Sequence, residues 1–189
     1  MIYYKCMTRY IALLRGINVG GNNKVSMSDL RDCFGSIGLK EVTTYINSGN
    51  VLFSSKDQNI VWLADECQRA IEKRFGFPVV VMVIPVRDLK AAIANAPIDW
   101  IDADSAKYRT DALFIIPPTT AEQVLAEIQK KATSVDKFFV YGQVIFWTLL
   151  KTQYNKSVVP KIIGTPIYKS VTIRGSNTVK KLLSLSKSE

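Results

Sequence analysis

The chain of 189 residues contains no histidine. This absence excludes Ser-His-Asp and Cys-His catalytic triads, histidine-ligated zinc, and the commonest general base near neutral pH. Proton transfer in any reaction would fall to a lysine, a carboxylate or a tyrosine. The sequence therefore does not indicate a reaction and leaves open whether the protein is an enzyme. It gives no reason to expect a cofactor.

Cysteine is also scarce. The three cysteines, Cys6, Cys33 and Cys67, are odd in number and show no C-x-x-C spacing, which argues against a disulfide framework and a cysteine-only metal site. Cys33 and Cys67 fall in step with apolar residues at helical spacing. We therefore expect both to be core positions, where a thiol behaves as a small hydrophobe.

Long apolar runs are missing as well. No segment reaches the roughly 18 apolar residues that a membrane-spanning helix needs, so we expect no membrane partner. Residues 1–7 hold one lysine and no apolar core, which is unlike a secretory signal. Hydrophobic residues make up 48% and charged residues 22% of the chain, as in ordinary folded proteins. We expect a folded cytoplasmic protein.

Positive charge is abundant and unevenly placed. The net charge of the chain is +9, of which residues 1–150 carry +2 and residues 151–189 carry +7. Such asymmetry favours an anionic partner for the C-terminal third, such as a nucleic acid, a nucleotide or an acidic surface. A solvated basic face that keeps the protein in solution explains the same pattern, and both interpretations stay open.

Hydrophobic periodicity and turn residues predict a β-α-β-β-α-β order in residues 1–95, which is the order of a ferredoxin-like unit. The same order is predicted again in residues 111–189, followed by a C-terminal helix. We therefore expect an α+β fold made by tandem duplication of a ferredoxin-like βαββαβ unit, each half a two-layer α/β sandwich. The predicted strands are 10–15, 41–46, 51–54, 78–84, 111–116, 137–141, 144–149 and 170–174. The predicted helices are 26–38, 59–75, 85–94, 119–131, 157–163 (short, and interrupted near Pro160) and 177–185.

Residues 96–110 are predicted to join the two halves, because turn residues and acids cluster there. Asp99, Asp102 and Asp104 form a D-x-x-D-x-D pattern, and paired carboxylates can hold Mg²⁺ or Ca²⁺. The segment lacks the glycine of an EF-hand loop and has the composition of a solvated linker. No metal site is therefore expected.

Several predicted strands are apolar at consecutive positions, which is typical of strands covered on both faces. RNA-recognition domains use an open sheet face to stack bases. Four strand aromatics, Phe53, Tyr141, Phe146 and Trp147, are therefore expected in the core rather than on a stacking platform.

The segment from Arg15 to Lys24 is the strongest local indication of a binding site. It follows a strand, precedes a helix and contains Asn18, Gly20, Gly21 and Asn22. Glycines allow positive φ and expose successive N–H groups, and such a concavity at a helix N-terminus binds anions. The segment is neither a Walker A loop nor a clean G-x-G-x-x-G. A structural loop whose arginine pairs with an internal carboxylate is the alternative.

Two other segments are candidates for the same site. Ser48, Gly49 and Asn50 form a predicted hairpin turn whose side chains can also donate hydrogen bonds to a ligand. Arg174 and Asn177 repeat the R-G-x-N pattern of Arg15 and Asn18 after a strand. Two arginines at equivalent strand ends would suit a phosphate or carboxylate through bidentate hydrogen bonds.

These segments resemble one family, the bacterial domain-of-unknown-function family 1697. The resemblance covers almost the whole chain. It is carried by Ala12-Leu-Leu-Arg-Gly-Ile-Asn-Val-Gly-Gly21 with Lys24, Val25, Met27 and Leu30, by Tyr45-Ile-Asn-Ser-Gly-Asn-Val51 with Phe53, and by Thr172-Ile-Arg174 with Asn177-Thr-Val-Lys-Lys-Leu182.

The resemblance implies a duplicated ferredoxin-like α+β fold and no established activity, substrate or cofactor. The third segment departs from the family pattern T-x-R-N-x-N-T, because Gly175 stands where an asparagine is usual. A role for a side chain at that position is therefore in doubt, whereas Arg174 and Asn177 remain.

The leading hypothesis is that the protein binds a small phosphate- or carboxylate-bearing ligand at the glycine-rich loop. One alternative is a nucleic-acid-binding module that uses the basic C-terminal third, and another is a non-catalytic structural or partner-binding protein. The candidate ligand-binding residues are Arg15, Asn18, Gly20, Gly21, Asn22, Lys24, Ser48, Gly49, Asn50, Arg174 and Asn177. No catalytic residue is indicated.

Overall fold

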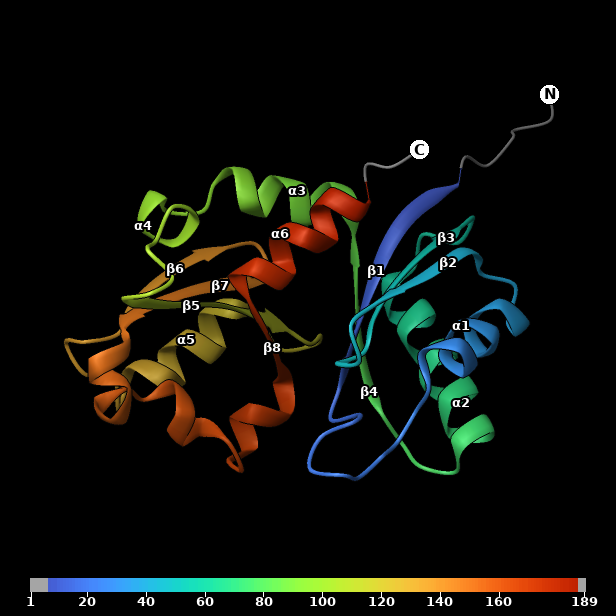
Figure 1. Ribbon diagram of the computed structural model, residues 1–189, viewed down its shortest axis with the longest axis horizontal. Coiled ribbons are helices and arrows are strands. Elements are labelled where there is room, and N and C mark those ends of the chain that lie inside the picture. Colours follow the sequence, from blue (N-terminus) through green and yellow to red (C-terminus); the bar gives the residue numbers. More distant parts are fainter. Residues whose placement is uncertain (1–6, 187–189) are drawn as a thin grey trace. The chain divides into compact units, whose positions relative to one another are not determined.

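The fold is α+β, with two four-stranded antiparallel sheets and helices, as expected (Figure 1). The computed structural model describes residues 7–186, so Cys6 and nearly all of the segment tested for a secretory signal lie outside it. The chain divides into two compact units. The first runs up to Leu89 and includes the chain from Leu182 onward, and the second is Lys90–Lys181.

No helix in residues 7–186 is both long enough and apolar enough to span a membrane.

The first unit has the predicted β-α-β-β-α-β order. Its strands pair in the order β2-β3-β1-β4, with every neighbouring pair antiparallel. Figure 1 shows α1 and α2 on one face of this sheet. The elements are β1 (Thr8–Arg15), α1 (Met27–Ser36), β2 (Lys40–Tyr45), β3 (Asn50–Ser55), α2 (Ile60–Phe75) and β4 (Val80–Pro85).

Capping residues set the ends of these helices. Ser26 precedes α1, and its hydroxyl accepts a hydrogen bond from the backbone N–H of Asp29 at 3.0 Å. Asn59 caps α2 in the same way for two backbone N–H groups. Gly76 then ends α2 in the left-handed conformation, with φ of 79°.

The core of the first unit lies between its sheet and its two helices. Tyr10, Ala12 and Leu14 point from β1 into this core, where Cys33 and Cys67 are also buried. The alternate residues of β1, Ile11 and Leu13, are fully buried as well. Both faces of this central strand are therefore shielded from water, as its consecutive apolar residues predicted.

The second unit repeats the strand order, as β6-β7-β5-β8. Where a short helix interrupted near Pro160 is predicted at 157–163, the structure has the 3-10 helix η2, and it is one of three short 3-10 segments between β7 and β8. Proline lacks the N–H that a continuous α-helix needs, so Pro160 and Pro166 keep η2 and η3 short. The elements that follow β4 in the chain are α3 (Val86–Ala94), α4 (Ile98–Ile101), β5 (Tyr108–Ile115), α5 (Ala121–Gln129), β6 (Lys137–Tyr141), β7 (Val144–Leu150), η1 (Lys151–Lys156), η2 (Val159–Ile162), η3 (Pro166–Ser170), β8 (Val171–Gly175) and α6 (Ser176–Leu185). The divisions between the units fall within α3 and α6.

The two faces of β7 are covered by different elements of the second unit. Trp147 belongs to the core that includes Val124 and Ile128 of α5. Phe146, its neighbour, points the opposite way and packs edge-on against Trp100 of α4, with ring centroids 4.8 Å apart. Of the four strand aromatics expected in the core, Phe53, Phe146 and Trp147 are at most 1% exposed, whereas Tyr141 is 37% exposed.

Asp136 ties the irregular segment of the second unit to the sheet. Its carboxylate accepts hydrogen bonds from the indole N–H of Trp147 at 2.9 Å and the backbone N–H of Val158 at 3.0 Å. It also accepts one from the hydroxyl of Ser157, which is fully buried. One carboxylate therefore satisfies three donors, and two of them belong to the segment that replaces a helix.

We expect Asp136→Ala to destabilise the protein by about 2–4 kcal/mol, because each buried donor left without an acceptor costs about 1–3 kcal/mol. Asp136→Asn keeps one carbonyl oxygen as an acceptor and should cost less. Urea denaturation followed by circular dichroism measures both. Asp65→Ala, which removes an exposed carboxylate from α2, is the control and should change little. Equal stability of the Asp136→Ala and control variants would contradict this role.

The two described cysteines should be unreactive in the native state. Burial raises the pKa of the thiols of Cys33 and Cys67, and thiol reagents attack the thiolate. In a Cys6→Ser variant, we expect Ellman's reagent to react at least about a hundredfold more slowly with native than with guanidine-unfolded protein. Rapid release of one thionitrobenzoate equivalent from the native variant would show that one of these thiols is accessible.

Candidate functional site

The loop between β1 and α1 owes its shape to backbone conformations that glycine and asparagine adopt most easily. Gly20 and Gly21 have φ of 59° and 81°, and Asn18 and Asn23 have φ of 54° and 50°. The backbone N–H of Asn18 donates to the carbonyl of Asn23 at 3.1 Å and closes the loop. The sequence therefore folds here into a compact turn.

The side chain of Asn18 fixes this loop in place. Its oxygen accepts a hydrogen bond from the backbone N–H of Val25 at 2.8 Å, and its amide nitrogen donates to the carbonyl of Val25 at 2.9 Å. The same nitrogen donates to the carbonyl of Asn47 at 2.9 Å. The side chain of Asn18 thus connects the start of the loop to its end at Val25, and connects the loop to the β2–β3 turn at Asn47.

The β2–β3 turn contains the predicted residues Ser48, Gly49 and Asn50. The carbonyl of Gly49 accepts a hydrogen bond from the backbone N–H of Leu14 at 2.8 Å, so this turn lies against the end of β1. Asn50 is fully buried, and its amide donates to the hydroxyl of Ser48 and the carbonyl of Tyr45, each at 3.0 Å. These contacts are those of a hairpin turn held against its sheet.

A surface hollow of about 510 Å³ lies where this loop meets the start of α1. Three predicted residues, Asn18, Gly21 and Lys24, line it together with Asn47 and Ser26. Lys24 is exposed and forms no ion pair with any residue in 7–186. The structure therefore gathers part of the predicted set around one concave surface.

The predicted backbone donors lie at the same loop. Gly20, Gly21 and Asn22 are exposed, and within the described chain the N–H groups of Gly20 and Gly21 have no hydrogen-bond acceptor. Gly20 and Asn22 are not among the residues that line the hollow. The loop therefore presents two donors to solvent beside an ammonium group.

The N-terminus of α1 contributes less positive potential than its position implies. Asp29 stands in the first turn, where the hydrogen bond from Ser26 and then the contact with Arg74 lower the pKa of its carboxyl. This carboxylate offsets the helix dipole. Lys24 is therefore the main cationic group at the hollow.

The two arginines of the predicted site, Arg15 and Arg174, lie at strand ends. Arg15 is half-buried at the end of β1, opposite Val80. Arg174 is 8% exposed at the end of β8 in the second unit, and burial lowers the pKa of its guanidinium to about 10, which leaves it charged at neutral pH. One of its nitrogens donates to the hydroxyl of Thr172 at 3.0 Å. Asn177, in α6, is exposed. Convergence of the two arginines on one ligand stays a prediction.

The acidic joint segment forms ion pairs instead of a carboxylate cluster. The amine of Lys137 lies 3.2 Å from Asp99, and that of Lys107 lies 3.6 Å from Asp104. Among residues 7–186, no three histidine, cysteine or acidic side chains are placed to hold a metal ion.

Sequence reasoning missed a second concave surface, which lies in the second unit between α5 and the segments η2 and η3. The available signals were the adjacent Lys130 and Lys131 at the end of an amphipathic helix, and the apolar residues Val158 and Ile162 of a segment interrupted by prolines. Their proximity depends on the tertiary fold, so neither signal indicates a cavity by itself.

Comparisons with known proteins fit this architecture. A family model described as "Protein of unknown function (DUF1697)" matches residues 7–146. Among solved structures, the chain is similar to the conserved bacterial protein SP0830 from Streptococcus pneumoniae, with 32% sequence identity and a TM-score of 0.84. That similarity covers 96% of this chain and 99% of the other. No curated protein matches.

Gly49→Ala should lower the stability of the protein by more than the strain of a positive φ at Gly49 alone would. A Cβ at Gly49 would lie 2.7 Å from the Cβ of Leu14 and 2.9 Å from the Cδ1 of Ile17. Gly76→Ala is the matched control, because its φ of 79° is close to the 75° of Gly49 and no atom lies within 4 Å of its added Cβ.

Strain at positive φ costs each variant about 1–2 kcal/mol, and overpacking adds about 1–3 kcal/mol at Gly49 only. Chemical denaturation of both variants measures the difference. If Gly49→Ala proves no less stable than Gly76→Ala, the close approach of this turn to β1 is not needed for the fold.

Proposed function

Because the chain belongs to the DUF1697 family of proteins of unknown function, we propose a function from the site itself: the protein binds a small phosphate- or carboxylate-bearing ligand at the loop between β1 and α1. The observation that carries this proposal is the hollow that Asn18, Gly21 and Lys24 line. Its volume of about 510 Å³ is within the range of small-molecule sites, roughly 300–1,000 Å³.

The groups that line the hollow and the adjacent Gly20 have distinct roles in this proposal. The backbone N–H groups of Gly20 and Gly21 donate hydrogen bonds to the anion, and Lys24 supplies the opposite charge. Asn18 acts as a positioning residue, because its amide holds the loop through Val25 and Asn47. A loop that is already ordered loses little conformational entropy when it binds a ligand.

The proposed site extends to the neighbouring residues of the predicted set. Ser48 is included as a polar group of the adjacent turn, which the buried Asn50 holds in shape, and Asn22 is included as an exposed amide at the tip of the loop. Arg15, at the end of β1, is proposed to neutralise the ligand further. The proposal includes no catalytic step.

The repeated strand order supports a proposal about the origin of the fold. The first sheet has the order β2-β3-β1-β4 and the second has the matching order β6-β7-β5-β8. We propose that both are copies of one ferredoxin-like unit, the second having exchanged its last helix for 3-10 segments, with residues 96–110 as the joint.

Two lysines of the basic C-terminal third, Lys151 and Lys180, donate hydrogen bonds to backbone carbonyls of the second unit. Lys151 donates to the carbonyl of Ser105 at 2.5 Å, and Lys180 donates to the carbonyl of Ile101 and lies 6.0 Å from the ring of Trp100. Both lysines stay exposed and charged, so the nucleic-acid alternative is decided by the same experiment as the small-anion proposal.

Thermal unfolding with inorganic phosphate, citrate, adenosine monophosphate and a 20-nucleotide RNA tests the site. A ligand at a hundred times its Kd stabilises the native state by about 2.7 kcal/mol, which raises the Tm by roughly 5–10 °C at this chain length. We expect such a shift with at least one small anion, and we expect Lys24→Gln to lose most of it. Lys56→Gln, which removes an exposed lysine outside the hollow, should keep it.

A further variant separates the parts of the proposal. Arg15→Lys keeps the charge and removes bidentate geometry, so a loss of the shift in this variant would support the extended site. Shifts with RNA alone that vanish in salt and ignore Lys24 would replace this proposal with nucleic-acid binding. The absence of any shift would leave the loop with a purely structural role.

A further inference from the structure

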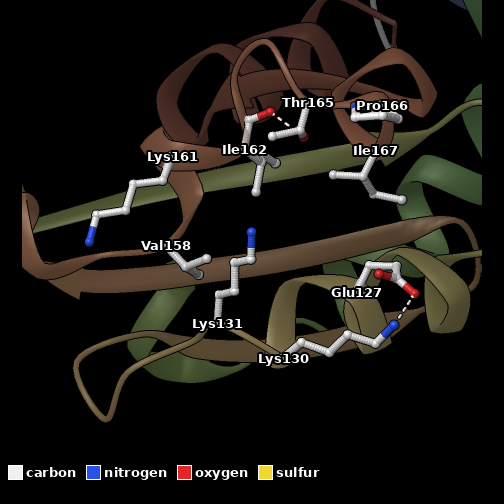
Figure 2. A pocket seen from close by; sticks show the side chains of 9 residues that line it. All are labelled: Glu127, Lys130, Lys131, Val158, Lys161, Ile162, Thr165, Pro166 and Ile167. Carbon is white, nitrogen blue, oxygen red and sulfur yellow. Dashed lines mark hydrogen bonds and ion pairs between the residues drawn. The ribbon is translucent and has the colours of Figure 1, made fainter.

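A cavity of about 430 Å³ lies in the second unit, between α5 and the segments η2 and η3 (Figure 2). Much of its lining is apolar. Val158 and Ile162 are 2% and 5% exposed, and Pro166 and Ile167 continue the apolar surface. Sites for small organic molecules have this character, with apolar walls and a few polar groups.

The polar groups of this cavity are mostly cationic. Lys130 lies 2.6 Å from Glu127, so that pair is neutral. Lys131 and Lys161 form no ion pair with any described residue, which leaves the lining with a net charge of +2. Figure 2 shows the amine of Lys131 in the middle of the ring of lining side chains, whereas Lys161 points outward.

An ammonium group above an apolar surface is complementary to one kind of small molecule. The apolar surface favours an aliphatic or aromatic body, since removal of apolar area from water stabilises a complex. The ammonium of Lys131 favours a single anionic head through a charge-assisted hydrogen bond. The hydroxyl of Thr165 donates to the carbonyl of Ile162 at 2.6 Å, so its hydrogen is already engaged.

We propose that this cavity binds a small organic carboxylate, with its apolar body against Val158, Ile162 and Ile167 and its carboxylate on Lys131. This site is separate from the one proposed for the first unit and uses different groups. A polynucleotide is a poorer occupant, because phosphate backbones need a row of cations whereas this cavity offers two unpaired lysines beside an apolar wall.

Calorimetric titration with 2-naphthoate tests the proposal, with 2-naphthamide as the neutral counterpart and inorganic phosphate as the charge without an apolar body. We expect 2-naphthoate to bind, the amide to bind at least about tenfold more weakly, and phosphate not to bind at this cavity. Lys131→Gln should weaken 2-naphthoate binding about tenfold or more, and Lys131→Arg should restore most of it.

Controls assign the binding to this cavity. Lys156→Gln removes an exposed lysine of the same unit that does not line the cavity, and it should bind 2-naphthoate as the wild type does. In methyl-labelled protein, the resonances of Ile162 and Ile167 should shift on titration. Lys131 and Lys156 are both exposed, so neither substitution removes a buried group whose loss could unfold the protein.

Three results would overturn the proposal: no binding of 2-naphthoate up to about 1 mM, equal affinity in wild type and Lys131→Gln, or equal affinity for the acid and the amide. Its failure is distinguishable from failure of the first site. Lys24→Gln should leave 2-naphthoate binding unchanged, and Lys131→Gln should leave unchanged the stabilisation assigned to the loop.

Discussion

Burial of the central strands on both faces is the constraint on which the rest of this structure depends. In β1, Ile11 and Leu13 are as fully buried as Ala12 between them, and in β5 Ala112 and Leu113 are likewise buried. Such strands stabilise the fold by removing apolar surface from water, and they offer a ligand no open central platform. Polar groups that could bind a ligand are consequently found at strand ends and in loops.

The two proposed sites meet this constraint in different ways. The loop of the first unit is held by side chain to backbone hydrogen bonds of Asn18 and presents N–H donors beside Lys24. The cavity of the second unit is lined by Val158 and Ile162, with Lys131 as its cation. The first arrangement selects for charge and hydrogen-bond geometry, whereas the second selects for an apolar body with a charged end.

Local signals in the sequence predicted most of the fold. Ser26, Asn59 and Gly76 cap or end helices through contacts within a few residues, so their patterns are visible in the chain. The 3-10 segments were harder to predict, because Val158 and Ile162 fit an amphipathic helix and only the spacing of two prolines opposes it.

Long-range contacts account for what the sequence could not predict. Asn18 was chosen for its place in a motif, but its hydrogen bond to Asn47, 29 residues away, is a property of the fold. The cavity beside Lys131 joins the end of α5 to residues about 30 positions later, and no local pattern relates them. The sequence could indicate the loop of the first unit but not the cavity of the second.

The 3-10 segments make the outer layer of the second unit different from that of the first. In the first unit, α1 and α2 pack together over one sheet face and fill the layer with side chains. At the place that α2 occupies in the order of elements, the second unit has three short segments joined by irregular backbone, and its cavity opens beside them. Short turns in place of a continuous helix leave space beside the sheet of the second unit, so that unit has a cavity where the first has a packed layer.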